Sequence, residues 1–395
     1  MADTWLSLIG IGEDGRAGLS AEALAWLDRA EVIFGGARHL ALAGAGARGQ
    51  AWPVPFSLAP VLACRARPVA VLTSGDPFWF GAGGGLAAHL PPGEWRALPA
   101  PSSFALAAAR LGWRLEETIC LGLHAAPLTR LRPHLSRGRR LLCLLRGPET
   151  VAECALWLTA QGFGASRLWR LEALGGPRES ITENCAQTWD AAPGIAPVAV
   201  AVEVAGGLGL PRAPGLPDEL FEHDGQITKR AVRALTLSAL APRPGECLWD
   251  IGTGSGSVAV EWLLAAPDAR ACGVEAEAAR AARARRNAIN FGVEHRFSLL
   301  ESRAPDGLEI LPRPDAVFIG GGASTALLER LWALAPAGTR LVVNAVTLET
   351  ETLATQWAAA KGGSLLRLEL AEARPLGRLR GWEPARPIVQ WSVVL

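Results

Sequence analysis

The chain has 395 residues, half of them hydrophobic, and its formal net charge is +1 at pH 7 with neutral histidines. This length favours two domains over one, and a charge so close to zero argues against a general electrostatic surface for nucleic acid or for membrane lipid. The seven cysteines are scattered, odd in number and without a CxxC spacing, so we predict neither a metal site nor a disulfide framework.

The opening residues, MADTWLSLIGIGEDG, lack the basic region and the long apolar run of a secretion signal. No run of 18 apolar residues is free of glycine, proline and charge, so the sequence predicts no membrane span. Together with the pattern of cysteines, these features predict a protein of the reducing cytoplasm.

The first half alternates short apolar segments with helical ones, which predicts an α/β fold with a mostly parallel sheet. Residues 20–30 are one predicted helix, and Ser20 is its expected N-cap. The predicted strands of this half are residues 5–12, 68–77, 117–124, 140–147, 166–174 and 197–204.

Three loops follow strands of this half and offer candidate ligand contacts. Gly10 and Gly12 lie at the end of the first strand, and Gly75-Asp76-Pro77 follows the second. In ALPAPSSFALAAARLG, Ser102 is the expected N-cap of a helix that begins near Ser103. A carboxylate after a parallel strand lies where α/β sheets bind ligands, although Gly-Asp-Pro is also a common turn.

The segments GIGEDGRAGLS, GGARHL, SGDPFWFG, PAPSSFALAAARLGW, LGLH and LGGPRES resemble the C5-methylating branch of the tetrapyrrole methylases, over essentially residues 1–205. The resemblance implies two α/β lobes with S-adenosylmethionine in the cleft between them, held by the three loops above. Many relatives have Pro-Gly where this chain has Glu13-Asp14. His124 ends a strand, and both a substrate contact and a structural role remain open for it.

The strongest break in the chain is the Gly- and Pro-rich segment AGGLGLPRAPGLPDEL. It predicts one domain over residues 1–208, a linker over 209–217 and a second domain over 218–395. In the second domain a helix is expected over 227–240, and five parallel strands followed by an antiparallel pair predict the seven-stranded Rossmann-like fold of class I methyltransferases. The predicted strands are residues 247–254, 269–277, 296–304, 314–322, 340–348, 364–373 and 387–395.

LWDIGTGSGSVAVEW predicts a strand, a glycine turn and the start of a helix. The turn consists of Gly252, Thr253, Gly254, Ser255 and Gly256. A dinucleotide fingerprint requires a third glycine where Ser257 stands, and the carboxylate of Asp250 would repel a pyrophosphate but attract a cationic cofactor. S-adenosylmethionine is such a cation, and its own carboxylate suits the N–H groups of a helix N-terminus.

Glu275 ends the next predicted strand, where a carboxylate can accept both hydroxyls of a ribose. Because this feature serves NAD equally well, a nicotinamide-dependent oxidoreductase stays open as an alternative, as does a structural turn. The segment FIGGGAS lacks the aromatic, amide and proline residues typical of enzymes that methylate amino groups of nucleic-acid bases. Its glycines suit the rim of a site for a large flat substrate, or a mobile loop.

Five segments of the second half resemble the decarboxylating C15-methyltransferases of corrin biosynthesis: HDGQITKRAVRALTLSAL, LWDIGTGSGSVAVE, SRAPDGL, VFIGGG and LVVNAVTLET. The resemblance implies cofactor contacts at Thr228, Gly252 to Gly256, Glu275 and Ala304. Family members usually have glutamate where this chain has Ala231.

The pairing of these two domains resembles the fused C5,15-methyltransferases of that pathway. It implies one S-adenosylmethionine site in each domain, methylation of precorrin-6Y at C5 and C15, and loss of the C12 acetate carboxyl to give precorrin-8 of cobalamin biosynthesis. It also implies a homo-oligomer, and any cobalt would arrive inside the tetrapyrrole substrate. A non-catalytic protein that binds S-adenosylmethionine is the remaining alternative.

A substrate with acetate and propionate side chains requires cationic groups. Lys229, Arg230 and Arg233 lie on or beside the helix that opens the second domain, and either a substrate site or a solvated helix face would account for them. His223 and Asp224 precede this helix and could move a proton, although an N-cap role for Asp224 is equally open.

Overall fold

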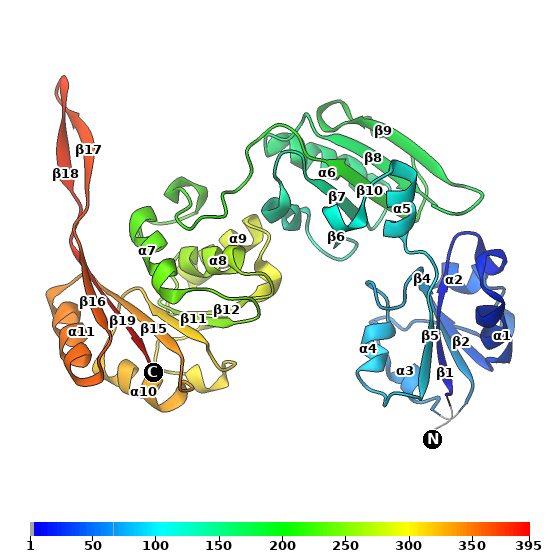
Figure 1. Cartoon of the computed structure of the whole chain (residues 1–395), viewed down its shortest axis with the longest axis horizontal. Helices are drawn as coiled ribbons and strands as arrows, with labels where there is room; N and C mark the ends of the chain where they lie inside the picture. The colour runs from blue at the N-terminus through cyan, green and yellow to red at the C-terminus, as the bar shows by residue number, and fades with distance from the viewer. Residues whose placement is uncertain (1–3, 66) are drawn as a thin grey trace. The chain divides into compact units, whose positions relative to one another are not determined.

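The computed structural model describes residues 4–65 and 67–395, which form two compact units (Figure 1). The first unit comprises the chain up to Leu128 together with His134–Leu208, and the second comprises Thr129–Pro133 together with Gly209–Leu395. None of the helices in the described ranges combines the length and the apolar character that a membrane crossing requires.

The first lobe of the first unit is a five-stranded parallel sheet in the order β3-β2-β4-β1-β5. Its central strands are buried along almost their whole length, which explains why they consist of continuous apolar runs. Helix α1 packs on one face, and α3 and α4 pack on the other. The elements are β1 (Leu6–Ile11), α1 (Ala21–Arg29), β2 (Val32–Gly35), α2 (Ala37–Leu42), β3 (Gly49–Ala51), α3 (Ala59–Leu62), β4 (Val69–Ser74), α4 (Gly83–Ala87) and β5 (Trp95–Leu98).

The second lobe is also a five-stranded sheet, in the order β6-β7-β10-β8-β9. Here the expectation of a mostly parallel sheet is wrong, because only the pair β6–β7 is parallel. Strands β8 and β9 are joined by residues 173–179, which return the chain beside β8 and make the two strands antiparallel neighbours. The elements are α5 (Ser103–Leu111), β6 (Thr118–Gly122), β7 (Arg140–Leu144), α6 (Glu149–Ala160), β8 (Arg167–Glu172), β9 (Ser180–Cys185) and β10 (Val198–Glu203).

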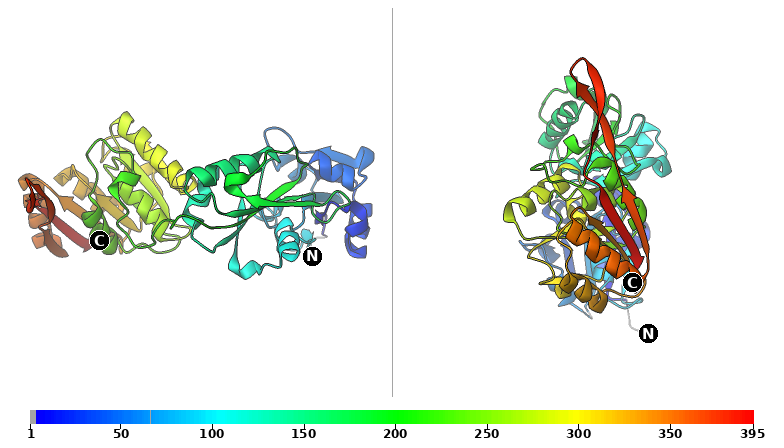
Figure 2. Two further views of the ribbon diagram at one scale, coloured as in Figure 1. Left: turned by 90° about the horizontal axis from the view of Figure 1, so that it is seen from above. Right: turned by 90° about the vertical axis from the view of Figure 1, so that its left-hand side faces the viewer.

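The second unit contains the expected seven-stranded sheet, in the order β13-β12-β11-β14-β15-β19-β16. Strand β19 runs antiparallel between β15 and β16, and the other neighbouring pairs are parallel. Helices α7, α8 and α9 pack on one face, and α10 and α11 pack on the other (Figure 2). The elements are α7 (Arg230–Leu240), β11 (Cys247–Ile251), α8 (Ser257–Ala265), β12 (Arg270–Glu275), α9 (Ala278–Asn290), β13 (Phe297–Glu301), β14 (Ala316–Ile319), α10 (Thr325–Leu334), β15 (Arg340–Ala345), α11 (Leu348–Lys361), β16 (Ser364–Leu368) and β19 (Ile388–Val394).

The segment between β16 and β19 forms a hairpin that extends away from this sheet, made of β17 (Ala371–Leu376) and β18 (Leu379–Pro384) (Figure 1). The prediction of a single strand over residues 364–373 is therefore wrong, because the chain leaves the sheet after Leu368. Leu376, Leu379 and Trp382 expose most of their surface on this hairpin.

Candidate functional sites

In the first unit, three loops at the carboxyl edge of the parallel sheet pack backbone against backbone. A Cβ added to Gly10 would lie 1.7 Å from the carbonyl oxygen of Gly75 and 2.6 Å from the amide nitrogen of Ala100. Gly75 has a φ of +59°, and a Cβ there would lie 2.5 Å from Cα of Ser102. The glycines predicted from the sequence are thus required where the ends of β1 and β4 meet the turn before α5.

A cavity of about 540 Å³ lies against these loops, a size typical of small-molecule sites. Gly12, Gly75, Ser102 and Ser103 line it, whereas Gly10, Asp76 and Pro77 do not. The N-cap role expected of Ser102 is confirmed, because its hydroxyl accepts the N–H of Ala105 at 3.1 Å. The N-cap role expected of Ser20 is confirmed in the same way, since its hydroxyl accepts the N–H of Ala23 at 3.1 Å.

Asp76 lies in the turn after β4, directly after Gly75 but outside the lining of the cavity. Its Oδ1 accepts the N–H of Phe78 at 2.8 Å, which is the hydrogen bond of an Asx turn. Pro77 follows and accepts the N–H of Gly83 at 2.9 Å through its carbonyl oxygen. In this arrangement both residues shape the loop.

Aromatic side chains form another wall of the cavity, and the sequence analysis did not single them out. They come from three segments, before α3, after β4 and on α5, and His124 lies close to Phe80 of the second segment. The aromatic lining residues are Trp52, Phe56, Trp79, Phe80 and Phe104. Three consecutive aromatic residues directly after a Gly-Asp-Pro turn were a usable signal, because a solvated turn has no need of them.

A polar cluster completes the lining and was also missed. Arg38 pairs with the buried carboxylate of Glu13, and Arg178 pairs with the same carboxylate at 3.1 Å. The guanidinium of Arg38 also contacts Ser74 Oγ at 2.7 Å and His39 Nε2 at 2.8 Å. Burial and the neighbouring Arg38 lower the pKa of His39 to about 4, so this imidazole is neutral at pH 7.

In the second unit, the loop between β11 and α8 is shaped by its glycines and by a buried acid. Gly252, Gly254 and Gly256 have φ values of +71°, +55° and +73°, which favour glycine. Asp250 is 1% exposed, and its Oδ2 accepts the hydroxyl of Thr253 at 2.8 Å and the N–H of Ala259 at 3.2 Å. Asp250 therefore holds the loop to the start of α8.

Burial raises the pKa of Asp250 to about 6, above its ordinary value of 3.8. Because the fold favours the protonated carboxyl, the stability that this group contributes is complete below pH 4 and is lost as the pH rises through 6. We expect Asp250→Asn to raise the free energy of unfolding at pH 7 by roughly 1–3 kcal/mol, since the amide oxygen can keep both hydrogen bonds. The gain should shrink towards pH 4.

Urea unfolding at pH 7 and at pH 4.5 measures this difference, and Asp268→Asn at an exposed position is the control. A stability change of the same size at both pH values would contradict the expectation.

Glu275 ends β12 directly beside this loop. Its Oε2 accepts the N–H of Gly254 at 2.9 Å, and its Oε1 accepts the N–H of Glu277 at 3.0 Å. A carboxylate has about four acceptor positions, so each oxygen retains capacity for a second donor. The carboxylate is fixed in position and can still receive two hydroxyl groups.

The remaining predicted contacts belong to neighbouring loops. The N–H of Ser302 donates to the carbonyl oxygen of Glu275, so the loop that contains Ala304 begins beside that residue. A Cβ added to Gly320 would lie 4.0 Å from the hydroxyl of Thr228, and one added to Gly252 would lie 3.4 Å from the carbonyl oxygen of Gly321. The loop after β14 is thus adjacent both to the glycine turn and to the segment before α7.

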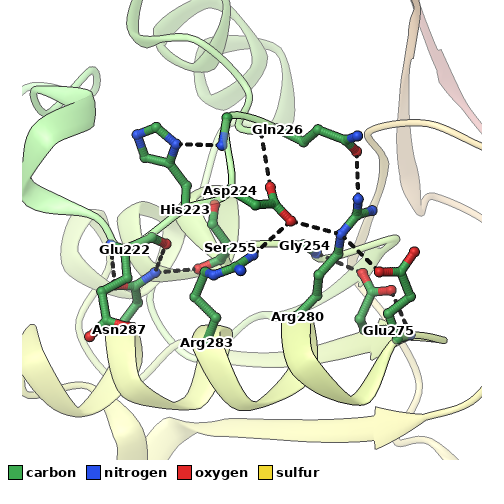
Figure 3. A network of polar contacts seen from close by, with 12 residues as sticks. Glu222, His223, Asp224, Gln226, Gly254, Ser255, Glu275, Arg280, Arg283 and Asn287 are labelled. Carbon is green, nitrogen blue, oxygen red and sulfur yellow. Dashed lines mark hydrogen bonds and ion pairs between the residues drawn. The ribbon is translucent and has the colours of Figure 1, made fainter.

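A polar network joins the glycine loop to the segment before α7 through helix α9 (Figure 3). The central residue is Asn287, which is fully buried and was missed in the sequence. Its Nδ2 donates to the carbonyl oxygens of Ser255 at 2.8 Å and Glu222 at 2.9 Å, and its Oδ1 accepts the N–H of Glu222 at 2.9 Å. An asparagine in a helix otherwise rich in alanine and arginine was the available signal.

The segment after Glu222 is held by the same helix. Asp224 Oδ2 pairs with Arg280 at 3.1 Å and with Arg283 at 2.9 Å, while its Oδ1 accepts the N–H of Gln226 (Figure 3). The hydrogen bond from Gln226 and the Arg283 guanidinium lower the pKa of Asp224 to about 2. The possibility that Asp224 moves a proton at neutral pH is therefore not supported.

The alternative role that the sequence left open for Asp224, the N-cap of α7, is not found, because Lys229 occupies that position. Helix α7 begins at Arg230, three residues later than expected, because Lys229 is extended and its carbonyl accepts the first helical N–H, from Arg233. His223 Nδ1 accepts the N–H of Gly225 at 3.0 Å, so the second ring nitrogen carries the proton of the neutral ring. Lys229 and Arg230 are exposed, and Arg230 Nε donates to the carbonyl oxygen of Gly215.

Arg233 cannot meet a substrate carboxylate. Its side chain is fully buried and pairs with Glu261 at 2.6 Å and with Asp218 at 2.9 Å, which ties the segment before α7 to α8. We expect Arg233→Met to destabilise the second unit by about 3–5 kcal/mol, because it leaves the buried carboxylate of Glu261 without its positively charged partner.

Chemical unfolding of the full chain measures this effect. Arg285→Met is a matched control, since Arg285 forms a solvent-exposed pair with Glu301 and should cost no more than about 1 kcal/mol. Equal effects of the two substitutions would contradict a structural role for Arg233.

Across the described ranges, no group of three His, Cys, Asp or Glu side chains is arranged to hold a metal ion. The two candidate sites are built from glycine loops, hydroxyls and single carboxylates at the carboxyl ends of parallel strands, which is where α/β folds bind small molecules.

Comparison with known proteins gives matches to both halves. Residues 6–188 match the family described as tetrapyrrole (corrin/porphyrin) methylases, and residues 219–395 match the precorrin methyltransferase domain. A precorrin-6Y C(5,15)-methyltransferase [decarboxylating] of Sinorhizobium sp is 50% identical over 98% of this chain and 96% of its own length. A protein of the same description from Mycobacterium tuberculosis (strain CDC 1551 / Oshkosh) is 38% identical over 98% of each chain.

Among solved structures, the C-terminal domain of precorrin-6Y C5,15-methyltransferase from Rhodobacter capsulatus is 54% identical. It covers 47% of this chain and 100% of its own, with a TM-score of 0.46.

Proposed function

Since the chain belongs to the family of decarboxylating precorrin-6Y C5,15-methyltransferases, we propose that it methylates C5 and C15 of precorrin-6Y and removes the carboxyl group of the C12 acetate. The product is precorrin-8, an intermediate of cobalamin biosynthesis. The observation that carries this proposal is the 50% identity to a relative of that description along almost the whole of both chains.

We assign C5 methylation to a domain over residues 1–208, and C15 methylation with decarboxylation to a domain over 218–395, with 209–217 as the linker. The order of the two family matches along the chain supports this division. Each domain would bind one S-adenosylmethionine.

In the first domain, we propose that the cofactor lies against the loops of Gly10, Gly12, Gly75-Asp76-Pro77 and Ser102-Ser103. The cavity of about 540 Å³ has room for it, and the close packing of Gly10 on Gly75 keeps the backbone N–H and C=O groups near its wall. Asp76 contributes by holding the turn, since one of its oxygens already accepts the N–H of Phe78.

In the second domain, we propose that Glu275 accepts the two ribose hydroxyls, while the turn from Gly252 to Gly256 approaches the rest of the cofactor. The anchored carboxylate with free acceptor positions fits that role. Asp250 fixes the turn, and Thr228 and Ala304 stand on loops beside Gly320 and Glu275.

Bound S-adenosylmethionine supplies an electrophilic methyl group. The residues of the chain then have to hold the reacting ring carbon in line with it and exclude water, and such positioning can provide ~7–11 kcal/mol of the barrier reduction. A neutral His39 and a lining with few charged groups are consistent with a site that works by positioning. Loss of the acetate carboxyl needs an electron sink, which the conjugated macrocycle can provide, and a proton donor, for which His223 is the candidate. Lys229 and Arg230 are candidates for pairing with the carboxylates of the substrate.

The proposal is tested by incubating the full chain with precorrin-6Y and S-adenosylmethionine and following product mass. We expect the gain of two methyl groups and the loss of carbon dioxide. If neither the methyl gain nor the loss of carbon dioxide were observed, a non-catalytic binding protein would be favoured. If calorimetry showed binding of NAD(P) in place of S-adenosylmethionine, an oxidoreductase would be favoured.

We further propose that the enzyme acts in the cytoplasm as a homo-oligomer. The β17–β18 hairpin supports self-association, because an isolated two-stranded ribbon with exposed Leu376, Leu379 and Trp382 is marginally stable in water. Light scattering of the purified chain measures the oligomeric state, and a monomer at all concentrations would contradict this.

A further inference from the structure

We propose that Arg38 forms a carboxylate-binding subsite in the wall of the first unit's cavity, and that this subsite holds an acetate or propionate group of the tetrapyrrole during C5 methylation. The inference rests on the proposed function, from which the carboxylate-rich substrate follows. Nothing in the chain's glycine loops or in its family matches assigns such a role to Arg38.

The cluster around Glu13 carries an excess of positive charge. Glu13 is 8% exposed and pairs with both Arg38 and Arg178, so two guanidinium groups share one carboxylate. His39, which contacts Arg38, is neutral at pH 7 because its pKa is about 4. One positive charge is therefore left over at this wall, and an anionic ligand can neutralise it.

The guanidinium of Arg38 is accessible from the cavity. The side chain of Arg38 is 32% exposed and lines the cavity, whereas Arg178 is not among the lining residues. Glu13, Ser74 and His39 engage three N–H groups of the Arg38 guanidinium, which has five. The N–H of Nε and one N–H of Nη1 remain, and each can donate a single charge-assisted hydrogen bond to a carboxylate oxygen. The three existing contacts hold the guanidinium in place before a ligand arrives.

Arg38 also lies beside the rest of the proposed site. Ser74 ends β4 and directly precedes Gly75, so Arg38 is anchored to the same turn that borders the proposed cofactor site. The aromatic side chains of Trp52, Phe56 and Phe80 line the same cavity. They offer apolar faces to a flat macrocycle, while Arg38 would receive one of its charged side chains.

A carboxylate could also come from the methionine part of S-adenosylmethionine, and kinetics separate the two sources. We expect Arg38→Gln to raise KM for precorrin-6Y in the C5 step about 10- to 100-fold, as expected for the loss of a charge-assisted contact. KM for S-adenosylmethionine and the C15 reaction of the same chain should not change. A rise in KM for the methyl donor alone would overturn the substrate subsite.

Arg67→Gln is the matched control, because it removes an exposed guanidinium that pairs with Glu31 at 3.1 Å away from the cavity lining. We expect its KM values to stay within about twofold of the wild type. Arg38→Lys keeps the charge but not the planar fork, and it should give an intermediate KM. Equal effects of Arg38→Gln and Arg67→Gln on KM for precorrin-6Y would show that the effect does not come from a carboxylate contact in the cavity, and would overturn the proposal.

A test without mutation uses precorrin-6Y whose side-chain carboxyl groups are amidated. In the C5 step, the wild-type chain should have a higher KM for this amidated analogue than for precorrin-6Y itself. The ratio of these two KM values should be smaller in Arg38→Gln than in the wild type. If the ratio of the two KM values were the same in Arg38→Gln as in the wild type, the proposed subsite would be wrong. A wild-type chain that does not methylate C5 at all would instead overturn the proposed function.

Discussion

Gly10→Ala is expected to lower C5 methylation at least ~100-fold and to leave C15 methylation intact, because a misplacement of about 1 Å is enough for such a loss. The added Cβ would lie 1.7 Å from the carbonyl oxygen of Gly75 and 2.6 Å from the amide nitrogen of Ala100. Both neighbours are backbone atoms, so relief requires the loops to separate. This separation would displace the wall of the cavity to which Gly75 and Ser102 belong.

The measurement is product mass after incubation with precorrin-6Y, which reports each methylation separately. Gly84→Ala is the matched control, because a Cβ at this exposed position of α4 meets no atom within 4 Å. Alanine there should keep both activities and can add up to about 1 kcal/mol of stability, since it is the better helix former. Normal C5 methylation by Gly10→Ala would contradict the close packing of these loops.

Glu275→Gln is expected to raise KM for S-adenosylmethionine in the C15 step about 100-fold. The carboxylate of Glu275 accepts two backbone N–H groups, those of Gly254 and Glu277. The amide of glutamine keeps only one acceptor oxygen, so its NH₂ group faces one of these two backbone donors. It therefore weakens both the ribose contact and the glycine turn. The C5 reaction should be unaffected, because it belongs to the other unit.

Glu277→Gln serves as the control for this substitution. Glu277 lies two residues further along the chain, is exposed and pairs only at the surface with Arg280 at 3.3 Å. We expect its donor KM to stay within about twofold of the wild type. If Glu275→Gln and Glu277→Gln behaved alike, the assignment of the ribose site to Glu275 would be wrong.

The framework of the second unit was predictable because its central parallel strands, β11, β12, β14 and β15, are buried along almost their whole length. Such strands consist of continuous apolar runs, and each is followed by a glycine or polar turn. The first unit was harder. Strand β9, SITENC, is an exposed edge strand without an apolar run, and its antiparallel pairing with β8 depends on the connection between them.

The contacts around single charged residues were not predictable. Arg233 and Arg230 lie three residues apart on α7, yet Arg233 is fully buried between Asp218 and Glu261 while Arg230 is exposed. Helical periodicity indicates which face such a residue occupies, but not whether that face meets acids from other segments. The same limit applies to Asp224, whose partners lie more than fifty residues later on α9.

Local sequence patterns in this chain determine much of its secondary structure. Apolar runs form the buried strands, glycines with positive φ form turns, and the serines at positions 20 and 102 begin helices. Long-range packing specifies the chemistry of the cavity wall, where Glu13, Arg38 and Ser74 converge from three segments and Arg178 pairs with Glu13 from outside the lining. Their charge balance depends on distances between atoms far apart in the chain, and such distances exist only once the sheets and loops have assembled.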